Sequence, residues 1–496
     1  VFPGRESPSP IKTDRVNGTD LIKLRQLPGG LYFSKPKRRW STKRGRRGVD
    51  TLLYTAQEIV RILRVGFELA RGRRKKLTSV DKANVMETGR LWHAIADEID
   101  NKLEIIAKAE SVDNGKPISL ARTVDIPRAS LNFRFFASAI TSFSSESHAM
   151  EDSAINYTLN QPIGVVGCIS PWNLPLYLFT WKIAPALAIG NCVIGKPSEI
   201  TPMSAYLLSK ICIDVGLPAG VLNIIHGYGN KVGAAMSGHP KIPVISFTGG
   251  TSTGKRIAEA AAPHFKKLSL EMGGKNPNII FADCDYETTL STAVQSSFAN
   301  QGQICLCGSR IIIESSIYNQ FCIDLVDKTK SLVQGDPLKE STQQGAVVSE
   351  DHMAKIIKHI EMAKDDGGTV LTGGERNIVN GRCKEGWFIK PTVIEGIGTD
   401  SKINQEEVFG PVVTLLPFDS EEEALEIANS TNYGLTASIW TSDLSRAHRL
   451  AGQIEAGIVW INCWMLRDLR TPFGGVKNSG LGREGCLLYT SDAADE

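Results

Sequence analysis

The first readable segment of the chain has apolar residues at helical spacing, with acidic residues between them. These positions are three or four residues apart: Leu91, Ile95, Ile99, Leu103 and Ile106. Because residues at this spacing share one face of a helix, the pattern predicts a single amphipathic helix. It is expected to end at Asn114-Gly115, a typical stop signal.

From about residue 160, short apolar runs alternate with longer helical stretches. Strands are predicted at residues 164–170, 192–195, 221–225 and 244–248, with helices between them. Such alternation predicts a parallel sheet with right-handed crossovers, which binds ligands at the carboxyl ends of its strands. A second α/β unit is expected from about residue 271 to residue 470, so the predicted fold class is α/β.

The composition is ordinary for a folded protein, with 42% hydrophobic and 22% charged residues. No apolar stretch approaches the roughly 20 residues that a membrane-spanning helix needs, and no secretory signal is visible. Ten cysteines lack a framework spacing, and those in apolar runs, such as Cys168 and Cys192, are expected to be buried. We therefore expect a reducing, cytoplasmic location. Cys305 and Cys307 are too close together for zinc, so no metal is predicted.

The net charge of +3 hides an asymmetry. Residues 1–80 hold 20 Lys and Arg against 6 Asp and Glu, mostly in two basic runs at residues 35–47 and 71–76. Basic runs can bind nucleic acid, but a solvated arm is the commoner explanation, and a stretch that is not authentic coding sequence is another. Nucleic acid is therefore not the expected partner.

A glycine-rich loop follows the predicted strand at residues 244–248. It reads Gly249-Gly-Thr-Ser-Thr-Gly-Lys255 and opens a helix, where backbone N–H groups bind phosphate well. A P-loop would need Ser or Thr at Arg256, and the dinucleotide fingerprint would need glycine at Thr251. The loop alone predicts only an anion site, such as one for a pyrophosphate.

Several other segments carry a family pattern. They are Pro171-Trp-Asn-Leu-Pro175, residues 270–277, residues 298–305, Glu407-Val-Phe-Gly-Pro411 and residues 472–477. In order and spacing they resemble the aldehyde dehydrogenase superfamily over roughly residues 80–485. The resemblance implies a Rossmann-like NAD-binding domain, a second α/β catalytic domain and a small bridging element for oligomerisation.

The resemblance also implies domain boundaries. The NAD-binding domain would comprise residues 81–140 and 161–270, the bridging arm 141–160 and the catalytic domain 271–470, with 471–485 returning to the first domain. Residues 1–80 and 486–496 are atypical of the family. The expected assembly is a homodimer or homotetramer. Loss of the family's final strand would leave a sheet edge open, so an unstable or inactive product is an alternative.

By resemblance, Cys305 is the nucleophile, and its thiolate adds to the carbon of a small-molecule aldehyde. The Asn173 amide and the Cys305 backbone N–H would bind the oxyanion. After hydride passes to the nicotinamide, Glu271 would activate water to hydrolyse the thioester. Cys305 and Cys307 would share one face of a strand, so only the Gln-Gly-Gln-Ile spacing favours Cys305. Cys307 either shapes the pocket or forms a disulfide with oxidised Cys305.

Lys196-Pro-Ser-Glu199 resembles the family's clamp for the adenosine ribose. A carboxylate at Glu199 would repel a 2′-phosphate, which favours NAD over NADP. Glu407 and Phe409 match the positions that hold the nicotinamide ribose and ring. The cofactor-binding residues that the resemblance implies are Ile169, Ser170, Trp172, Lys196, Ser198, Glu199, Gly229, Phe247, Thr248, Gly249, Gly250, Glu407 and Phe409.

Residues 121–136 and 462–471 resemble one branch of the superfamily, which oxidises 2-aminomuconate and 2-hydroxymuconate semialdehydes. Those substrates carry a carboxylate far from the aldehyde, and Arg122 and Arg467 match the branch's carboxylate-binding positions. A surface salt bridge is the commoner fate of any single arginine. A broad-specificity enzyme for retinal-type or aliphatic aldehydes is the alternative. The presence of Glu271 favours hydrolysis to the free acid over transfer to coenzyme A.

Overall fold

The computed structural model describes residues 38–42, 45–49, 87–140, 147–150 and 153–485. The chain divides into two compact units, residues 1–90 and 91–496. In the first unit, β1 (Arg38–Thr42) and β2 (Gly45–Val49) pair as an antiparallel hairpin within the first basic run. The second basic run lies outside the described residues, so the structure does not test the nucleic-acid alternative.

The helix predicted over residues 91–114 is two helices. They are α3 (Glu87–Asn101) and α4 (Leu103–Asn114), separated by Lys102 with φ −103° and ψ 16°. The apolar positions Ile95, Ile99 and Ile106 are buried as predicted, and Gly115 ends α4 with φ +85°. Apolar spacing indicates which face is buried, but it does not report whether the backbone hydrogen bonding is continuous.

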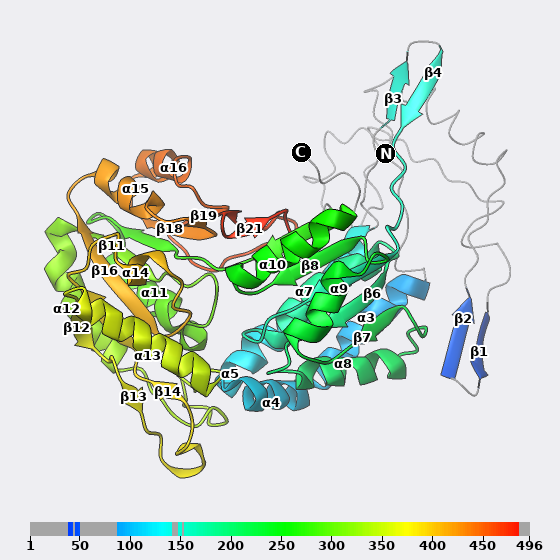
Figure 1. The fold of residues 1–496 in the computed structure, drawn as a ribbon, viewed down its shortest axis with the longest axis horizontal. Coiled ribbons are helices and arrows are strands. Elements are labelled where there is room, and N and C mark those ends of the chain that lie inside the picture. The colour runs from blue at the N-terminus through cyan, green and yellow to red at the C-terminus, as the bar shows by residue number, and fades with distance from the viewer. Residues whose placement is uncertain (1–37, 43–44, 50–86, 141–146, 151–152, 486–496) are drawn as a thin grey trace, which may run out of the picture. The chain divides into compact units, whose positions relative to one another are not determined.

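The first large sheet contains the four strands predicted between residues 164 and 248, together with β9, which was not predicted. Their bounds are β5 (Val165–Ile169), β6 (Cys192–Lys196), β7 (Leu222–Ile224), β8 (Val244–Thr248) and β9 (Lys267–Glu271). The order is β21-β9-β8-β5-β6-β7, and only β21 (Gly480–Leu481) is antiparallel. The chain runs outward from β5 and then returns to its other side, so β5 and β8 flank the topological switch point (Figure 1).

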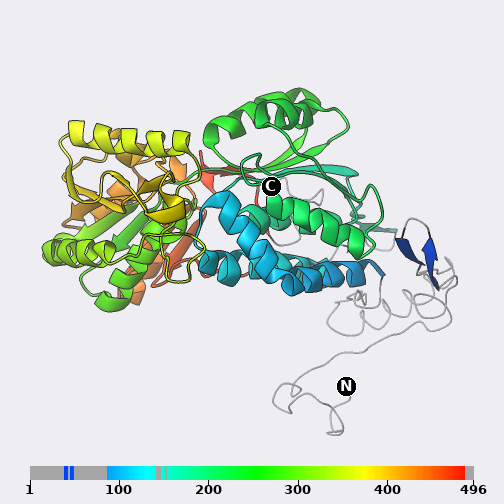
Figure 2. The ribbon, with the colours of Figure 1, turned by 90° about the horizontal axis from the view of Figure 1, so that it is seen from below.

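Helices cover both faces of this sheet (Figure 2). One face packs against α3, α4, α6 (Ile126–Ala139), α7 (Pro175–Ala188) and α8 (Met203–Asp214). The other packs against α9 (Ala234–Gly238) and α10 (Thr251–Ala261). Alternate strand residues serve the two cores, Val244 on the first face and Ile245 on the second. Cys192, at the start of β6, is exposed rather than buried as expected, whereas Cys168 is buried.

The second large sheet has the order β12-β15-β16-β11-β10-β18-β19, in which only β12 is antiparallel. Its strands are β10 (Pro277–Ile280), β11 (Arg310–Glu314), β12 (Thr369–Thr372), β15 (Thr392–Glu395), β16 (Val412–Phe418), β18 (Thr436–Trp440) and β19 (Ile458–Ile461). Its main helices are α11 (Tyr286–Phe298), α12 (Ser315–Lys330), α13 (Glu350–Asp365), α15 (Glu421–Asn429) and α16 (Leu444–Ala451). The predicted α/β fold class is confirmed.

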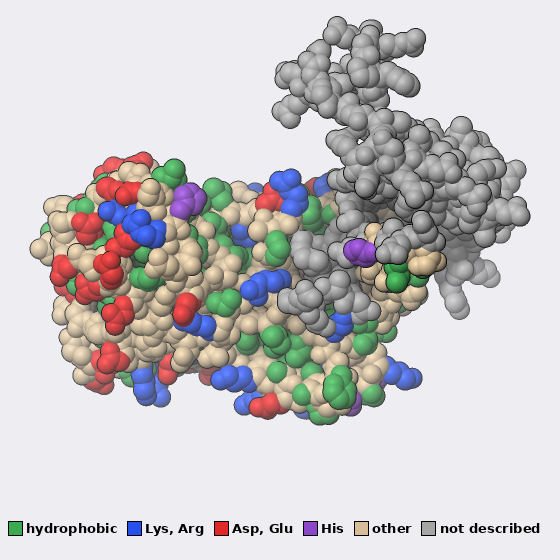
Figure 3. Space-filling model, turned by 90° about the horizontal axis from the view of Figure 1, so that it is seen from above, with side chains coloured by type: hydrophobic (Ala, Val, Ile, Leu, Met, Phe, Trp, Pro, Cys, Tyr) green, Lys and Arg blue, Asp and Glu red, His purple; other side chains and the backbone are tan. Residues whose placement is uncertain are grey.

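Short elements complete the described chain. They are α5 (Ile118–Leu120), a π-helix (Ala121–Asp125), β3 (Ser147–Met150), β4 (Ala154–Tyr157), a second π-helix (Gly229–Gly233), β13 (Arg376–Asn377), β14 (Phe388–Ile389), α14 (Lys402–Gln405), β17 (Tyr433–Gly434) and β20 (Val476–Lys477), besides three 3₁₀ turns. Acidic side chains gather toward the left in Figure 3, and the first turn of α15 alone holds Glu421, Glu422 and Glu423.

Candidate active site

Neighbouring strands of the first sheet end at the same edge, and several candidate residues are the last residues of these strands. Ile169 ends β5, Lys196 ends β6, Thr248 ends β8 and Glu271 ends β9. Parallel pairing puts these carboxyl ends together, so cofactor and catalytic candidates that lie far apart in sequence meet along one edge.

The loop that carries Cys305 has an unusual backbone. Asn300, Gln301 and Gly302 all have positive φ, at 51°, 58° and 69°. A Cβ on Gly302 would lie 2.0 Å from the Gly410 carbonyl oxygen, so only glycine allows this approach. Cys305 then sits in a turn before β11, half-buried, while Cys307 is buried. The shared-strand argument for the two cysteines was therefore wrong, because neither lies in a strand.

Side-chain amides hold this turn. Asn173 Nδ2 donates to the Gln303 carbonyl oxygen at 2.9 Å, and Asn276 Nδ2 donates to the Cys305 carbonyl oxygen at 2.7 Å. An amide nitrogen carries two hydrogens, so Asn173 keeps a second donor. The Cys305 N–H has no acceptor among the residues that the structure describes. These two donors are suited to bind an oxyanion beside the thiol.

Burial controls the ionisation of both catalytic candidates. Burial raises the pKa of the Cys305 thiol, and the Glu407 and Glu271 carboxyls raise it further. Glu271 is also buried, and its Oε1 has no hydrogen-bond partner in the described structure. Burial raises the pKa of Glu271 well above its usual value, and the charge of Glu484 adds to this effect. A carboxyl with a raised pKa is suited to act as a general base near neutral pH.

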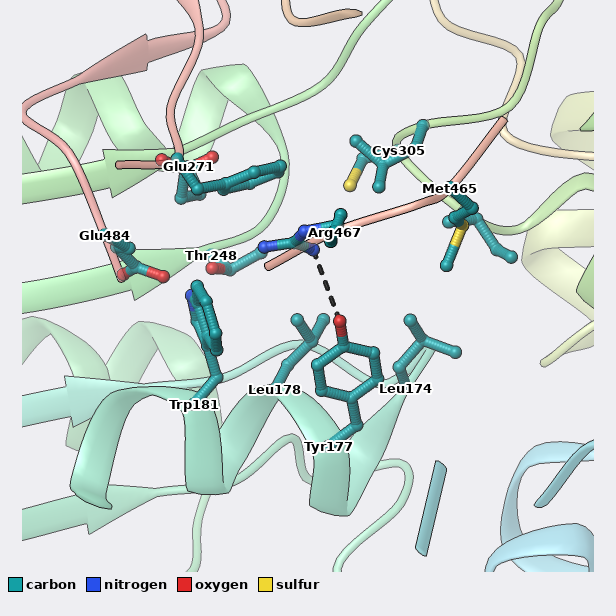
Figure 4. Close-up of a pocket in the computed structure, with 13 residues that line it drawn as sticks. Leu174, Tyr177, Leu178, Trp181, Thr248, Glu271, Cys305, Met465, Arg467 and Glu484 are labelled. Carbon is teal, nitrogen blue, oxygen red and sulfur yellow. Dashed lines mark hydrogen bonds between the residues drawn. The ribbon is translucent and has the colours of Figure 1, made fainter. Parts of the chain in front are cut away.

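Cys305 and Glu271 line one pocket. The Cys305 sulfur points into it, and Glu271 and Glu484 lie on the opposite side (Figure 4). Most of the remaining wall is aromatic or aliphatic: Leu174, Tyr177, Leu178, Trp181, Ile304, Leu306, Met465 and Phe473. Arg467 crosses the middle of the view and donates to the Tyr177 hydroxyl at 3.3 Å. The pocket is therefore apolar around one cation, two carboxyls and a thiol.

The residues predicted to hold the adenosine ribose form a connected set. Lys196 Nζ donates to Glu199 Oε2 at 2.8 Å, and the Gly229 N–H donates to Glu199 Oε1 at 3.1 Å. Partial burial raises the pKa of Glu199, but the hydrogen bonds from Lys196 and Gly229 outweigh it and hold the pKa below its usual value. The carboxylate is thus ionised, exposed and able to accept hydrogen bonds from hydroxyl groups. Ser198 Oγ accepts the Ile200 N–H and shapes the same turn.

The glycine loop leaves room for a phosphate. Gly250 caps the start of α10, and a Cβ there would meet nothing within 4 Å. A Cβ on Gly249 would lie 2.5 Å from the Phe247 ring, so that glycine is required. Two buried hydroxyls nearby, of Ser170 and Thr248, have no partner in the described structure. Open space, orphaned hydroxyls and a helix N-terminus fit a dinucleotide.

The nicotinamide-side candidates lie on a turn against Gly273 and Gly274. Glu407 Oε1 accepts the Gly274 N–H at 3.1 Å, and a Cβ on Gly273 would lie 2.2 Å from Glu407 Oε2. Burial raises the pKa of Glu407 to about 7. Phe409 has φ +60° and its ring contacts Trp172, with centroids 5.3 Å apart. The turn therefore connects the Trp172–Asn173 segment with the Cys305 loop.

The structure does not bring Arg122 to the pocket. Its guanidinium donates to Glu104 at 2.7 Å and to Glu340 at 2.8 Å, and Arg122 does not line the cavity. The assignment of Arg122 to substrate binding is therefore corrected: two carboxylates already occupy its donors. Arg128, one and a half turns later, lies over the pocket residues Tyr177 and Trp181 instead.

Metal and membrane functions gain no support from the described residues. Among them, no group of three or more His, Cys, Asp or Glu side chains could hold a metal ion. Their helices are also too short or too polar to cross a bilayer.

A model of the aldehyde dehydrogenase family matches residues 68–493. The chain belongs to the aldehyde dehydrogenase family. The protein is thus an oxidoreductase that acts on aldehydes, and the resemblance predicted from its motifs is confirmed. A model of the isocitrate/isopropylmalate dehydrogenases matches residues 1–122, which is less than half of the chain and establishes no membership.

Individual aldehyde dehydrogenases are similar to this chain over most of their length. The 2-aminomuconic semialdehyde dehydrogenase of Danio rerio is 48% identical over 402 residues, 80% of this chain and 82% of that protein. The crystal structure of PnpE from Pseudomonas sp. WBC-3 has a TM-score of 0.79 and 40% identity, covering 82% of this chain and 84% of that one. The P. syringae indole-3-acetaldehyde dehydrogenase AldA, solved with NAD+, has a TM-score of 0.80 and 34% identity over 90% of both chains.

Sequence reasoning missed Glu484, which lines the pocket, and Arg128, which packs against two of the lining residues. Arg128 stands in the same motif as Arg122 but was not singled out. Glu484, in the segment Gly482-Arg-Glu-Gly485, accepts from Lys182 Nζ at 2.5 Å and from Ser246 Oγ at 2.9 Å. Each of these residues reads as an ordinary surface charge in isolation, and only the fold brings Glu484 into the pocket and Arg128 against its aromatic wall.

Proposed function

We propose that this aldehyde dehydrogenase oxidises a semialdehyde with a carboxylate remote from the aldehyde, such as 2-aminomuconate semialdehyde, with NAD as the hydride acceptor. The product would be the free dicarboxylic acid. Among the similar proteins, the relative from Danio rerio is named for such a substrate. The observation that carries the proposal in this chain is a pair of arginines: Arg467 lines the pocket, and Arg128 packs against the pocket residues Tyr177 and Trp181.

Arg467 is held by aromatic rings and not by a carboxylate. Its guanidinium lies 3.7 Å from the Phe473 ring centroid and 4.9 Å from that of Trp181. These contacts and the Tyr177 hydroxyl fix its direction but leave its charge without an acidic hydrogen-bond partner among the described residues. A guanidinium in this environment is available to grip a carboxylate with two parallel hydrogen bonds.

Arg128 approaches the same tyrosine from α6. Its guanidinium carbon lies 5.6 Å from the Tyr177 ring centroid, and its buried Nε and Nη2 have no acceptor in the described structure. Burial lowers the pKa of Arg128, and the charge of Arg467 acts in the same direction. Two like charges with unused donors are costly to bury together, and a bound carboxylate would relieve that cost.

The first half of the reaction would use the Cys305 loop. The Cys305 sulfur attacks the aldehyde carbon and forms a hemithioacetal. The Asn173 amide and the Cys305 N–H then hold the new oxyanion, and both are fixed before the substrate arrives. A bound dinucleotide would supply the acceptor for the hydride that leaves this carbon.

The second half would use Glu271. After hydride departure, a thioester remains on Cys305, and Glu271 removes a proton from water that attacks it. Glu271 lines the pocket, and its Oε1 has no hydrogen-bond partner in the described structure that would compete for this proton. The exposed, ionised Glu199 carboxylate supports NAD over NADP, because it would repel a 2′-phosphate.

Three further assignments remain part of this proposal. Residues 81–140 and 161–270 would bind the cofactor, and residues 271–470 would carry the nucleophile. The arm at residues 141–160 would join subunits into a homodimer or homotetramer. A reducing, cytoplasmic location is supported by the free state of all the cysteines that the structure describes.

The test is NADH formation with a carboxylate-bearing semialdehyde and with a neutral aldehyde of similar length. For Arg128→Met and Arg467→Met, KM for the semialdehyde should rise about 10- to 100-fold, because each loses a charge-assisted bidentate contact. KM for the neutral aldehyde should change less than about threefold. Cys305→Ala should abolish NADH formation from both substrates.

Arg122→Met is the matched control, since it removes the same charge from the same motif but from a surface ion pair. It should leave both KM values within about twofold. Equal effects of Arg467→Met on the two aldehydes would reject the carboxylate proposal. They would instead favour the broad-specificity alternative.

A further inference from the structure

His352 stands in the first turn of α13, outside the pocket and outside every motif singled out from the sequence. Its backbone N–H donates to Ser349 Oγ, the cap of this helix, at 3.2 Å. Its ring is half-buried between two other rings: Trp172, with centroids 5.2 Å apart, and Phe409, with centroids 6.2 Å apart. His352 Nε2 lies 2.7 Å from the Phe409 carbonyl oxygen.

The protonation state of His352 follows from these contacts. Burial lowers its pKa to about 4, and the charges of Lys355 and His359 on the same helix act in the same direction. The imidazole is therefore neutral at neutral pH. Because a carbonyl oxygen only accepts, Nε2 must carry the proton and donate to Phe409.

One face of α13 contacts the backbone and side chains of a single turn. His352 bonds to Phe409, Lys355 Nζ donates to the Glu407 carbonyl oxygen at 3.2 Å, and His359 Nε2 lies 3.3 Å from Glu406 Oε2. Positions i, i+3 and i+7 of a helix share one face, so the helix itself points these three side chains toward the turn at residues 406–409.

The turn needs such support because its backbone is strained. Phe409 has φ +60°, a left-handed conformation that costs a bulky residue about 1 kcal/mol or more. Such a conformation persists only where surrounding contacts determine it. The next residue, Gly410, packs its carbonyl against Gly302 of the Cys305 loop, so a shift of Phe409 would reach the nucleophile.

We propose that His352 is a positioning residue that holds Phe409 in its left-handed conformation through the hydrogen bond to the Phe409 carbonyl, and thereby fixes the nicotinamide side of the cofactor site. The inference rests on the proposed cofactor role of Phe409. The imidazole also spans the gap to Trp172, so it joins the cofactor turn to the segment that carries Asn173.

The test compares His352→Leu, which removes the donor, with His352→Gln, which replaces the ring but keeps an N–H donor. NADH binding is measured by fluorescence titration without aldehyde, and KM values are measured for NAD and for aldehyde. His352→Leu should raise the NADH dissociation constant and the KM for NAD about 10-fold, the effect of an unsatisfied carbonyl. His352→Gln should stay within about threefold of wild type, and KM for the aldehyde at saturating NAD should barely change in either variant.

His359→Leu is the control on the same helix face, because its ring contacts the exposed side chain of Glu406 and not the strained backbone. It should bind NADH within about twofold of wild type. Normal NADH binding by His352→Leu overturns the inference, as does equal weakening by His352→Leu and His352→Gln, or by His359→Leu. If wild-type protein itself fails to bind NADH, the proposed function fails first and the inference falls with it.

Discussion

At the scale of single residues, burial sets both the chemistry and its pH dependence. The raised pKa of Glu271 means that the carboxyl becomes a base only above the range of an ordinary glutamate. The same burial raises the pKa of the Cys305 thiol, so in the proposed reaction attack and hydrolysis would both depend on deprotonation in an apolar pocket. Both steps should therefore slow as the pH falls.

Glu271→Gln should separate the two steps. The glutamine cannot accept a proton, so the thioester should form and then persist, with hydrolysis slowed about 10²- to 10⁴-fold. Rapid mixing with NAD and aldehyde should give one NADH per active site, followed by almost no turnover. In the wild type, kcat should fall as the pH drops through the raised pKa of Glu271.

Cys305→Ala provides the control, because it should give neither the burst nor the turnover. A Glu271→Gln enzyme that keeps wild-type turnover would show that another group activates the water. Retention of the wild-type pH profile in that variant would remove Glu271 from the pH dependence as well.

The two arginines of one motif show where sequence reasoning reaches its limit at this scale. Cys305, Glu271 and Asn173 belong to segments whose order identifies them, so their meeting in one site could be predicted. Arg122 and Arg128 are six residues apart, which turns their side chains by about 240° in an ideal helix. Arg122 also lies in a π-helix, where the turn is wider than an α-helix. The choice between them depends on helix geometry that apolar spacing does not reveal.

At the scale of elements, a buried charged cluster ties α4 and α6 to α7. Lys116 is fully buried, contacts Asp125 closely and lies 3.4 Å from Glu110 Oε1. Glu110 Oε2 accepts the Leu176 N–H at 3.2 Å, at the start of the helix that follows Asn173. Burial raises the pKa of Glu110 to about 8, so this carboxyl is protonated at neutral pH. The cluster therefore positions the start of α7, next to Asn173, through the hydrogen bond from Leu176 to Glu110.

Lys116→Met should destabilise the protein strongly, because it leaves the buried Asp125 without its ion-pair partner. Removing one member of a buried pair costs about 3–5 kcal/mol. Denaturant unfolding should show this loss, and Lys116→Met combined with Asp125→Asn should recover most of it. Glu110→Gln should cost less than about 1 kcal/mol, since a neutral amide replaces a neutral acid. A single Lys116→Met variant as stable as wild type would contradict this account.

The elements themselves were largely predictable. The strands β5 to β8 begin and end within one or two residues of the four apolar runs from which they were predicted. This agreement is expected because a buried parallel strand is a short apolar run between turn signals. The break at Lys102 and the π-helix at Ala121–Asp125 were not predicted, because both change the hydrogen bonding without changing the apolar pattern.

At the scale of the whole molecule, the arm at residues 141–160 presents apolar side chains to solvent. Ile155 and Tyr157 lie two residues apart in β4, so they share one face of the β3–β4 hairpin, and they are 55% and 59% exposed. Leu159 follows at 70% exposed. A two-stranded hairpin with an apolar face is marginally stable alone, so contact with another subunit is the expected way to cover it.

Ile155→Lys combined with Leu159→Lys should therefore shift the protein from a homodimer or homotetramer toward the monomer. Burying two lysines in a subunit interface without partners would cost more than the interface gains there. Light scattering after gel filtration measures the change in mass. Ile105→Lys is the matched control, since Ile105 on α4 is 63% exposed and lies outside the arm, and it should leave the mass unchanged. An unchanged mass for the arm variant, or a monomeric wild type, would remove the arm from assembly and leave its apolar face without a role.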